Sequence, residues 1–106
     1  MSLELEISDR AQEDVVRQYA WYAVHASEEI AERYLRAFYD TASRLVSSPS
    51  MGRKRKYLMP ELDNLRSFRL EDSFDAHLLF YHTDEGMLIV VRVMHGARDL
   101  PRRLHE

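Results

Sequence analysis

The stretch MLIVVRVMHGARDLPRRL, residues 87–104, decides the fold because it begins with the most apolar run in the sequence. Valine, isoleucine, leucine and methionine between Gly86 and Gly96 are typical of a strand that is buried on both faces. Such a strand lies inside a sheet, so the rest of the chain must cover it. The run ends in HGARD, residues 95–99, which places an imidazole, a guanidinium and a carboxylate where the strand stops.

The composition limits the class of protein. The chain has 106 residues, a net charge of −3 and no cysteine, which predicts one compact domain over residues 1–106. The absence of cysteine excludes disulfides and thiolate metal sites and favours a cytoplasmic location. We expect neither a signal peptide nor a membrane span. The charge argues against nucleic-acid binding over the whole surface, although a local basic patch stays possible.

The first half of the chain predicts a strand and two helices. Residues 3–7 alternate apolar and polar side chains, as a half-buried strand does. A helix follows from Ser8 or Asp9, and a second helix runs from about Glu28 to Ser47. The apolar stripe expected to be buried on the first helix is Ala11, Val15, Tyr19, Tyr22 and Ala26. The side chains expected on its solvent side are Arg10, Glu13, Asp14 and Arg17.

The second half predicts three strands, at residues 65–70, 76–82 and 88–94. The last two are joined by a turn over residues 83–86, with a glycine where a positive φ is needed. The fold class is therefore α+β, with a helical hairpin packed on a small, mainly antiparallel sheet. The first strand can join this sheet beside the last one. A basic run at residues 53–56 is expected in a loop, where it is either solvated or in contact with phosphate.

No motif for nucleotide, metal or cofactor binding is present, so we expect no cofactor and no metal. Two interpretations of the polar cluster remain open. His95, with Arg69 and Arg98, could move a proton and hold a phosphate during phosphodiester cleavage. Alternatively, Arg98 and Asp99 cap the end of the sheet through a salt bridge or hydrogen bonds. Trp21 likewise either covers the edge of the core or anchors a partner.

The chain resembles ParE-type toxins of the RelE/ParE superfamily. The resemblance rests on a set of residues in fixed order that spans nearly the whole chain. Its C-terminal part is the pattern V-x-H-G-x-R-D, which follows an apolar strand. The matching residues are Leu45, Pro49, Gly52, Pro60, Leu62, Leu65, Arg66, Arg69, Tyr81, Val93, His95, Gly96, Arg98 and Asp99.

This resemblance implies a β-α-α-β-β-β fold and the toxin of a bacterial type II toxin–antitoxin module. ParE-like toxins act on DNA gyrase, and a ParD-like antitoxin neutralises them. The toxin would then bind protein without catalysis of its own. The RelE-like branch implies the alternative, a ribosome-dependent endoribonuclease that cleaves messenger RNA. In that alternative the catalytic set would be Arg69, His95 and Arg98.

Two groups of site residues follow from the resemblance. The candidates for toxin activity are Arg69, Tyr81, His95, Arg98 and Asp99. A groove between the helical hairpin and the sheet is expected to receive an antitoxin helix or strand. The candidates for antitoxin binding are Trp21, Tyr22, Leu35, Arg98 and Arg103.

Overall fold

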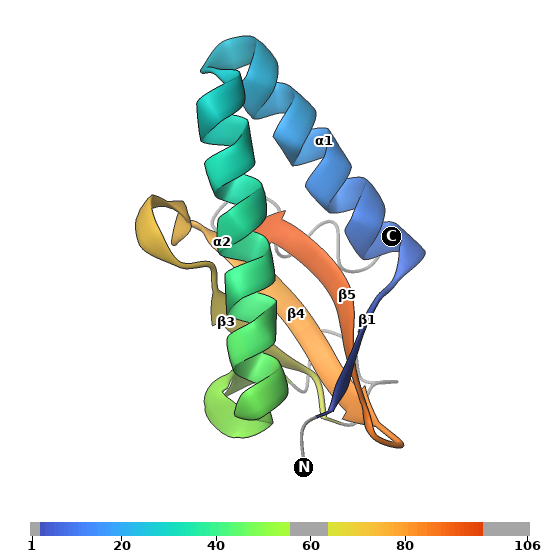
Figure 1. The fold of residues 1–106 in the computed structure, drawn as a ribbon. Helices are drawn as coiled ribbons and strands as arrows, with labels where there is room; N and C mark the ends of the chain where they lie inside the picture. Colours follow the sequence, from blue (N-terminus) through green and yellow to red (C-terminus); the bar gives the residue numbers. More distant parts are fainter. Residues whose placement is uncertain (1–2, 56–63, 97–106) are drawn as a thin grey trace.

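The computed structural model describes residues 3–55 and 64–96. Its two helices meet at a short turn and cover one face of a sheet (Figure 1). The α+β class predicted from the sequence is therefore confirmed. The elements are β1 (Glu4–Ile7), α1 (Asp9–His25), α2 (Glu28–Ser47), β2 (Arg53–Lys54), β3 (Arg66–Arg69), β4 (His77–Asp84) and β5 (Met87–His95).

The sheet has the order β1-β5-β4-β3-β2, which places the first strand beside the last. β1 runs parallel to β5, and the other neighbouring pairs are antiparallel. A parallel neighbour needs a long crossover, and the helical hairpin of α1 and α2 provides it. β4 and β5 are joined at Glu85-Gly86, where both residues have a positive φ, as two-residue hairpin turns require. The predicted turn and the predicted place of the first strand are both confirmed.

The basic run at residues 53–56 is only partly a loop, so that prediction was wrong. Arg53 and Lys54 form β2, which pairs antiparallel with Ser67 and Arg66 of β3. A strand of two residues is too short to leave an alternating pattern in the sequence. Only its pairing with β3 reveals it.

Serine side chains begin both helices. The Ser8 hydroxyl accepts a hydrogen bond from the Ala11 amide, and the Ser27 hydroxyl accepts one from Ile30. α2 buries the stripe that its apolar spacing predicts, and that stripe is Ala31, Tyr34, Phe38, Ala42 and Leu45. No helix in residues 3–55 or 64–96 has the length and apolar character needed to cross a bilayer.

The sheet carries an apolar cluster on each face. The larger one lies under the helices and includes Leu79, Leu88 and Val90. The smaller one, on the outer face, consists of Leu65, Phe80 and Met94, with Leu78 and Val91 packed against it. β5 is buried on both faces only near its end, because Met87, Ile89 and Val91 are half-buried.

A β-bulge reverses which residues of β5 point to each face of the sheet. Phe80 of β4 lies opposite Arg92, whereas the next residue, Tyr81, lies opposite Val90, so Val91 is an extra residue. After the bulge, Val93 packs in the cluster under the helices and Met94 packs in the outer one. The apolar run alone could not show this change of face.

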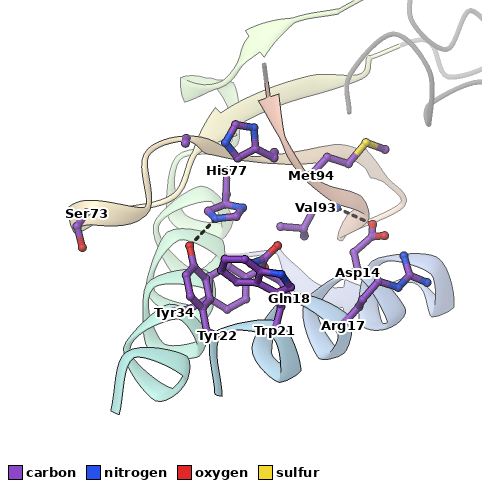
Figure 2. Close-up of a pocket in the computed structure, with 12 residues that line it drawn as sticks. Asp14, Arg17, Gln18, Trp21, Tyr22, Tyr34, Ser73, His77, Val93 and Met94 are labelled. Carbon is purple, nitrogen blue, oxygen red and sulfur yellow. Dashed lines mark hydrogen bonds between the residues drawn. The ribbon is translucent and has the colours of Figure 1, made fainter. Parts of the chain in front are cut away.

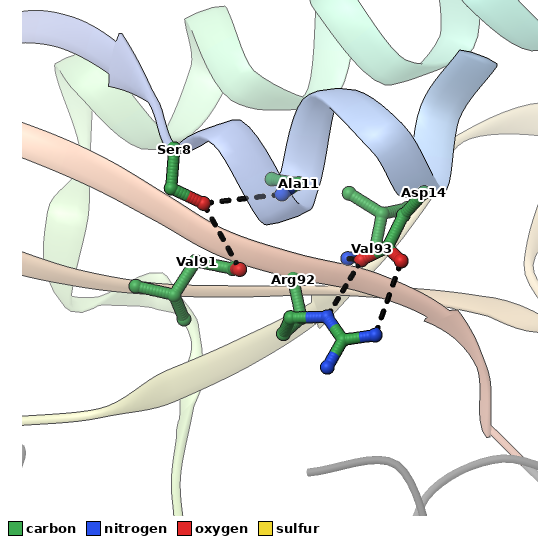
Figure 3. Close-up of polar contacts among 6 residues, drawn as sticks. All are labelled: Ser8, Ala11, Asp14, Val91, Arg92 and Val93. Carbon is green, nitrogen blue, oxygen red and sulfur yellow. Dashed lines mark hydrogen bonds and ion pairs between the residues drawn. The ribbon is translucent and has the colours of Figure 1, made fainter. Parts of the chain in front are cut away.

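Asp14 of α1 is buried, contrary to the expectation that it lies on the solvent side of the helix. β1 pairs with β5 only as far as Val90, and no other strand of the described residues lies beside the rest of this edge of β5. Asp14 accepts a hydrogen bond from the Val93 amide at 2.9 Å and pairs with Arg92 at 2.8 Å. Figure 3 shows this carboxylate between the two elements, and it shows Ser8, the N-cap of α1, donating to the carbonyl of Val91.

Replacing Asp14 with alanine should lower the free energy of unfolding by about 3–5 kcal/mol. The reason is that Arg92 would remain buried without its carboxylate and the Val93 amide would lose its acceptor. Urea denaturation of the purified protein measures the change. The matched control is Glu13→Ala, which removes the neighbouring exposed carboxylate and should change stability by less than about 0.5 kcal/mol. Equal effects of the two substitutions would contradict this role for Asp14.

Candidate functional site

A pocket of about 440 Å³ lies where the second half of α1 passes over the end of the sheet (Figure 2). α1 contributes Trp21 and Tyr22, and α2 contributes Tyr34. The sheet contributes His77, at the start of β4, and His95, at the end of β5. The pocket is thus formed by residues that are far apart in the sequence, and we call it the helix-side pocket.

Hydrogen bonding and ring contacts connect the two layers around this pocket. The Tyr22 hydroxyl and Nε2 of His77 are 2.9 Å apart (Figure 2). The His77 ring also meets the rings of Tyr34 and His95 edge to face, with centroids 5.2 and 5.7 Å apart. His77 is only 5% exposed, so its ring is a fixed part of the pocket wall and holds α1 over the sheet.

Burial shifts the titration of the tyrosines. Burial raises the pKa of Tyr34 well above its ordinary value, and the nearby charge of Asp14 raises it further. Burial also raises the pKa of Tyr22. The Tyr34 hydroxyl has no hydrogen-bond partner among the described residues. It is therefore a polar group that lost its hydration without gaining a bond in the folded protein.

Apolar side chains on α1 beside the pocket are exposed. Trp21 is 51% exposed and stacks on the ring of His25 at 4.6 Å. Val24, three residues after Trp21 and therefore next to it on the helix surface, is 77% exposed. Val16 is 67% exposed but lies about 140° around the helix from Trp21, because the two are five residues apart. An exposed tryptophan beside an exposed valine is typical of a surface that binds another protein.

A second pocket, of about 390 Å³, is lined by Arg55, Arg69, Asp75, Leu78 and His95 among others. Leu78 belongs to the apolar cluster on the outer face of the sheet. We call this pocket the outer-face pocket. It brings together Arg69 and His95, two of the predicted activity residues, and adds Arg55. His95 lines both pockets, so it lies at the boundary between the two faces.

Tyr81, the third predicted activity residue in the described ranges, is fully buried. Its hydroxyl donates to the carbonyl of Pro49 at 2.7 Å and accepts from the Gly52 amide at 2.9 Å. Burial raises its pKa, while the bond from Gly52 and the charge of Arg66 act in the opposite direction. Tyr81 thus holds the turn after α2 against the sheet and lies away from both His77 and His95.

The predicted antitoxin-binding residues are divided. Trp21 and Tyr22 line the helix-side pocket, as the predicted groove requires. Leu35 is half-buried and packs against the core instead. Arg98, Asp99 and Arg103 lie outside the described residues. No cluster of histidine, aspartate and glutamate that could hold a metal ion occurs in the ranges 3–55 and 64–96.

Sequence reasoning missed three residues of these sites. Tyr34 belongs to the apolar stripe of the second helix and reads as an ordinary core residue, whereas neighbouring strand positions could bring His77 near Tyr81 and His95. Arg55 belongs to the basic run at residues 53–56, and the sequence does not show on which face of the protein that run lies. The only available signal was the pairing of predicted strands, which would have placed His77 near His95 but could not have placed either one beside Tyr22.

Replacing Tyr34 with phenylalanine should make the free energy of unfolding fall less as the pH becomes alkaline. A raised folded-state pKa means that the contribution of Tyr34 to stability is complete below its unfolded-state pKa of 10.0 and is lost as pH rises through the folded-state pKa. Urea denaturation at about pH 8 and about pH 11 measures the difference. Removing the unpartnered hydroxyl should also leave stability at about pH 8 unchanged or raise it by up to about 1 kcal/mol.

The control for this substitution is Tyr39→Phe, because Tyr39 is exposed on α2. It should leave both stabilities unchanged. An equal loss of stability between the two pH values in the parent protein and in the Tyr34→Phe variant would contradict the burial argument.

Comparisons with known proteins agree with this fold and these motifs. Residues 5–100 match the family described as the ParE toxin of the type II toxin–antitoxin system parDE. Toxin ParE1 of two Mycobacterium tuberculosis strains, CDC 1551 / Oshkosh and ATCC 25618 / H37Rv, is 36% identical over 75 residues, which cover 70% of this chain and 69% of the relative. A solved structure titled "Chromosomal ParDE TA system from P. aeruginosa" has the same fold, with a TM-score of 0.71, 17% identity and coverage of 89% of this chain and 96% of that one. The chain therefore belongs to the ParE toxin family of type II toxin–antitoxin systems.

Proposed function

We propose that this chain is a cytoplasmic toxin that inhibits DNA gyrase by binding it, and that a ParD-like antitoxin neutralises it. The observation that carries the proposal is the match of residues 5–100 to the ParE toxin family. The solved relative of the same fold is titled as a ParDE system, which supports an antitoxin of the ParD type. This chain shares the H-G-x-R-D pattern of ParE-like toxins at residues 95–99, and that resemblance supports gyrase as the target.

The antitoxin is proposed to bind α1 and the helix-side pocket. The adjacent exposed groups Trp21 and Val24 give it a surface whose burial is favourable. Trp21 and Tyr22 line the pocket beside this surface, so one antitoxin segment could cover both. Leu35 packs against the core but is only half-buried, and its exposed part is proposed to contribute from α2. Arg98 and Arg103, outside the described residues, are kept as proposed contacts to acidic antitoxin residues.

Toxin activity is proposed to depend on the end of the sheet. Arg69 and His95 line the outer-face pocket, where they are accessible to a large target. Arg98 and Asp99, which follow β5 in the sequence, are proposed to extend this contact. Tyr81 is proposed to act indirectly, by holding the turn at Pro49–Met51 in place.

The purified toxin should inhibit supercoiling by purified gyrase and should increase the amount of cleaved DNA that gyrase holds. Gel electrophoresis of plasmid DNA measures both effects, and primer extension on translated messages in cells that express the toxin is the parallel measurement. Uninhibited supercoiling without trapped cleavage would contradict the proposal. New message ends together with unaffected gyrase would favour the RelE-like ribonuclease instead.

Replacing Trp21 with alanine should weaken antitoxin binding by at least about 2 kcal/mol, roughly thirtyfold, if Trp21 is an anchor of the interface. Titration calorimetry with the antitoxin encoded beside the toxin measures the affinity. The control is Tyr39→Ala, which removes a similarly exposed aromatic ring on α2 that does not line the helix-side pocket. Equal affinities of the Trp21→Ala variant and the parent toxin would rule out binding at this place.

A further inference from the structure

Three arginines lie on the outer face of the sheet, opposite the helices. Arg53 of β2 is paired with Ser67 of β3, and Arg69 follows two residues later on the same side. The Arg55 side chain lies beside them, because its Nε donates to the Ser67 hydroxyl at 2.8 Å. This side is the outer one, since Ser67 is paired with Phe80 of the outer apolar cluster.

In the part of the chain that the structure describes, these arginines have few groups that could neutralise them. Within the described ranges, neither Arg53, Arg55 nor Arg69 forms an ion pair, whereas Arg44 and Arg92 each do. Asp75 is the one described carboxylate that lines the outer-face pocket. Guanidinium groups collected on adjacent strands repel one another, and an anion between them relieves that repulsion.

The outer-face pocket offers a place for such an anion. Arg55, which directly follows β2, and Arg69 of β3 line it, and His95 lines it from the end of β5. Nδ1 of His95 is buried and has no hydrogen-bond partner among the described residues. A phosphate group accepts several hydrogen bonds at once, and its geometry matches the fork of a guanidinium.

The surroundings favour a backbone contact to duplex DNA over recognition of a single strand. Single-stranded nucleic acids are usually bound by stacking of bases on exposed aromatic rings. On the outer face, the one phenylalanine, tyrosine or tryptophan among the described residues is Phe80, and it is fully buried. We propose that the outer face around Arg55, Arg69 and His95 binds the phosphate backbone of duplex DNA. This inference rests on the proposed function, because gyrase holds DNA where the toxin acts.

Two consequences follow from the charge of the chain. The net charge is −3, so the rest of the surface does not attract DNA, and the contact alone is weak and sensitive to salt. Bound to gyrase, however, the toxin is held close to DNA, and a weak contact is then sufficient.

The helix-side pocket and the DNA-binding face also lie on opposite sides of the sheet.

The test is fluorescence anisotropy of a labelled DNA duplex with the purified full chain, without gyrase, over a series of salt concentrations. Arg69→Ala and Arg55→Ala should each weaken binding about fivefold to tenfold and reduce the salt slope by about 0.9 for each phosphate that the variant no longer neutralises. The matched control is Arg33→Ala, which removes the same charge from the exposed surface of α2 and should leave binding unchanged. Circular dichroism confirms that each variant is folded.

Several results would overturn the DNA contact. They are undetectable binding of the duplex by the parent protein, an equal loss of affinity in the control variant, and tighter binding of single-stranded RNA of the same sequence. Displacement of the duplex by micromolar inorganic phosphate would assign the pocket to a free anion instead. Gyrase inhibition is measured separately. A chain that binds DNA through Arg69 but leaves gyrase active would contradict the proposed function and not the DNA contact.

Discussion

The carboxylate of Asp14 binds the part of the β5 edge that lies beyond the end of its pairing with β1. β1 stops beside Val90, whereas β5 continues to His95, so the outward backbone groups of β5 need partners other than a strand. α1 lies along this edge, and Asp14 accepts from the Val93 amide while it pairs with Arg92 (Figure 3). Buried backbone groups and a buried guanidinium are costly without partners. This contact therefore determines where the helix lies on the sheet.

The position of α1 determines the helix-side pocket. Because Asp14 holds the first half of the helix to β5, the second half extends past the end of the sheet (Figure 1). There Trp21 and Tyr22 line a pocket with His77 and His95, and Tyr22 bonds to His77 (Figure 2). The same position leaves Val16 and Val24 facing outward with no other element of the described chain covering them. The antitoxin surface that we propose is thus a consequence of how one helix is attached.

The two faces of the sheet differ in chemistry. The helix face ends in tyrosines, histidines and tryptophan, which suit a protein partner that buries aromatic surface. The outer face carries Arg53, Arg55 and Arg69 around an open pocket, which suits an anion. A toxin that must bind an antitoxin and a target could use these faces separately. His95 and Ala76 line both pockets, so the two pockets share part of their wall.

The sequence by itself determined the order of the elements other than the two-residue strand β2, the helical hairpin and the place of the first strand, because spacing and turn residues are local signals. It also indicated the polar cluster at the end of the last strand. Only the tertiary structure decided that Asp14 is buried, that Val91 forms a bulge, that Tyr81 is an internal support and that His77 meets Tyr22. Each of these depends on contacts between residues far apart in the chain, and the pattern of one segment contains no information about which distant group it will meet.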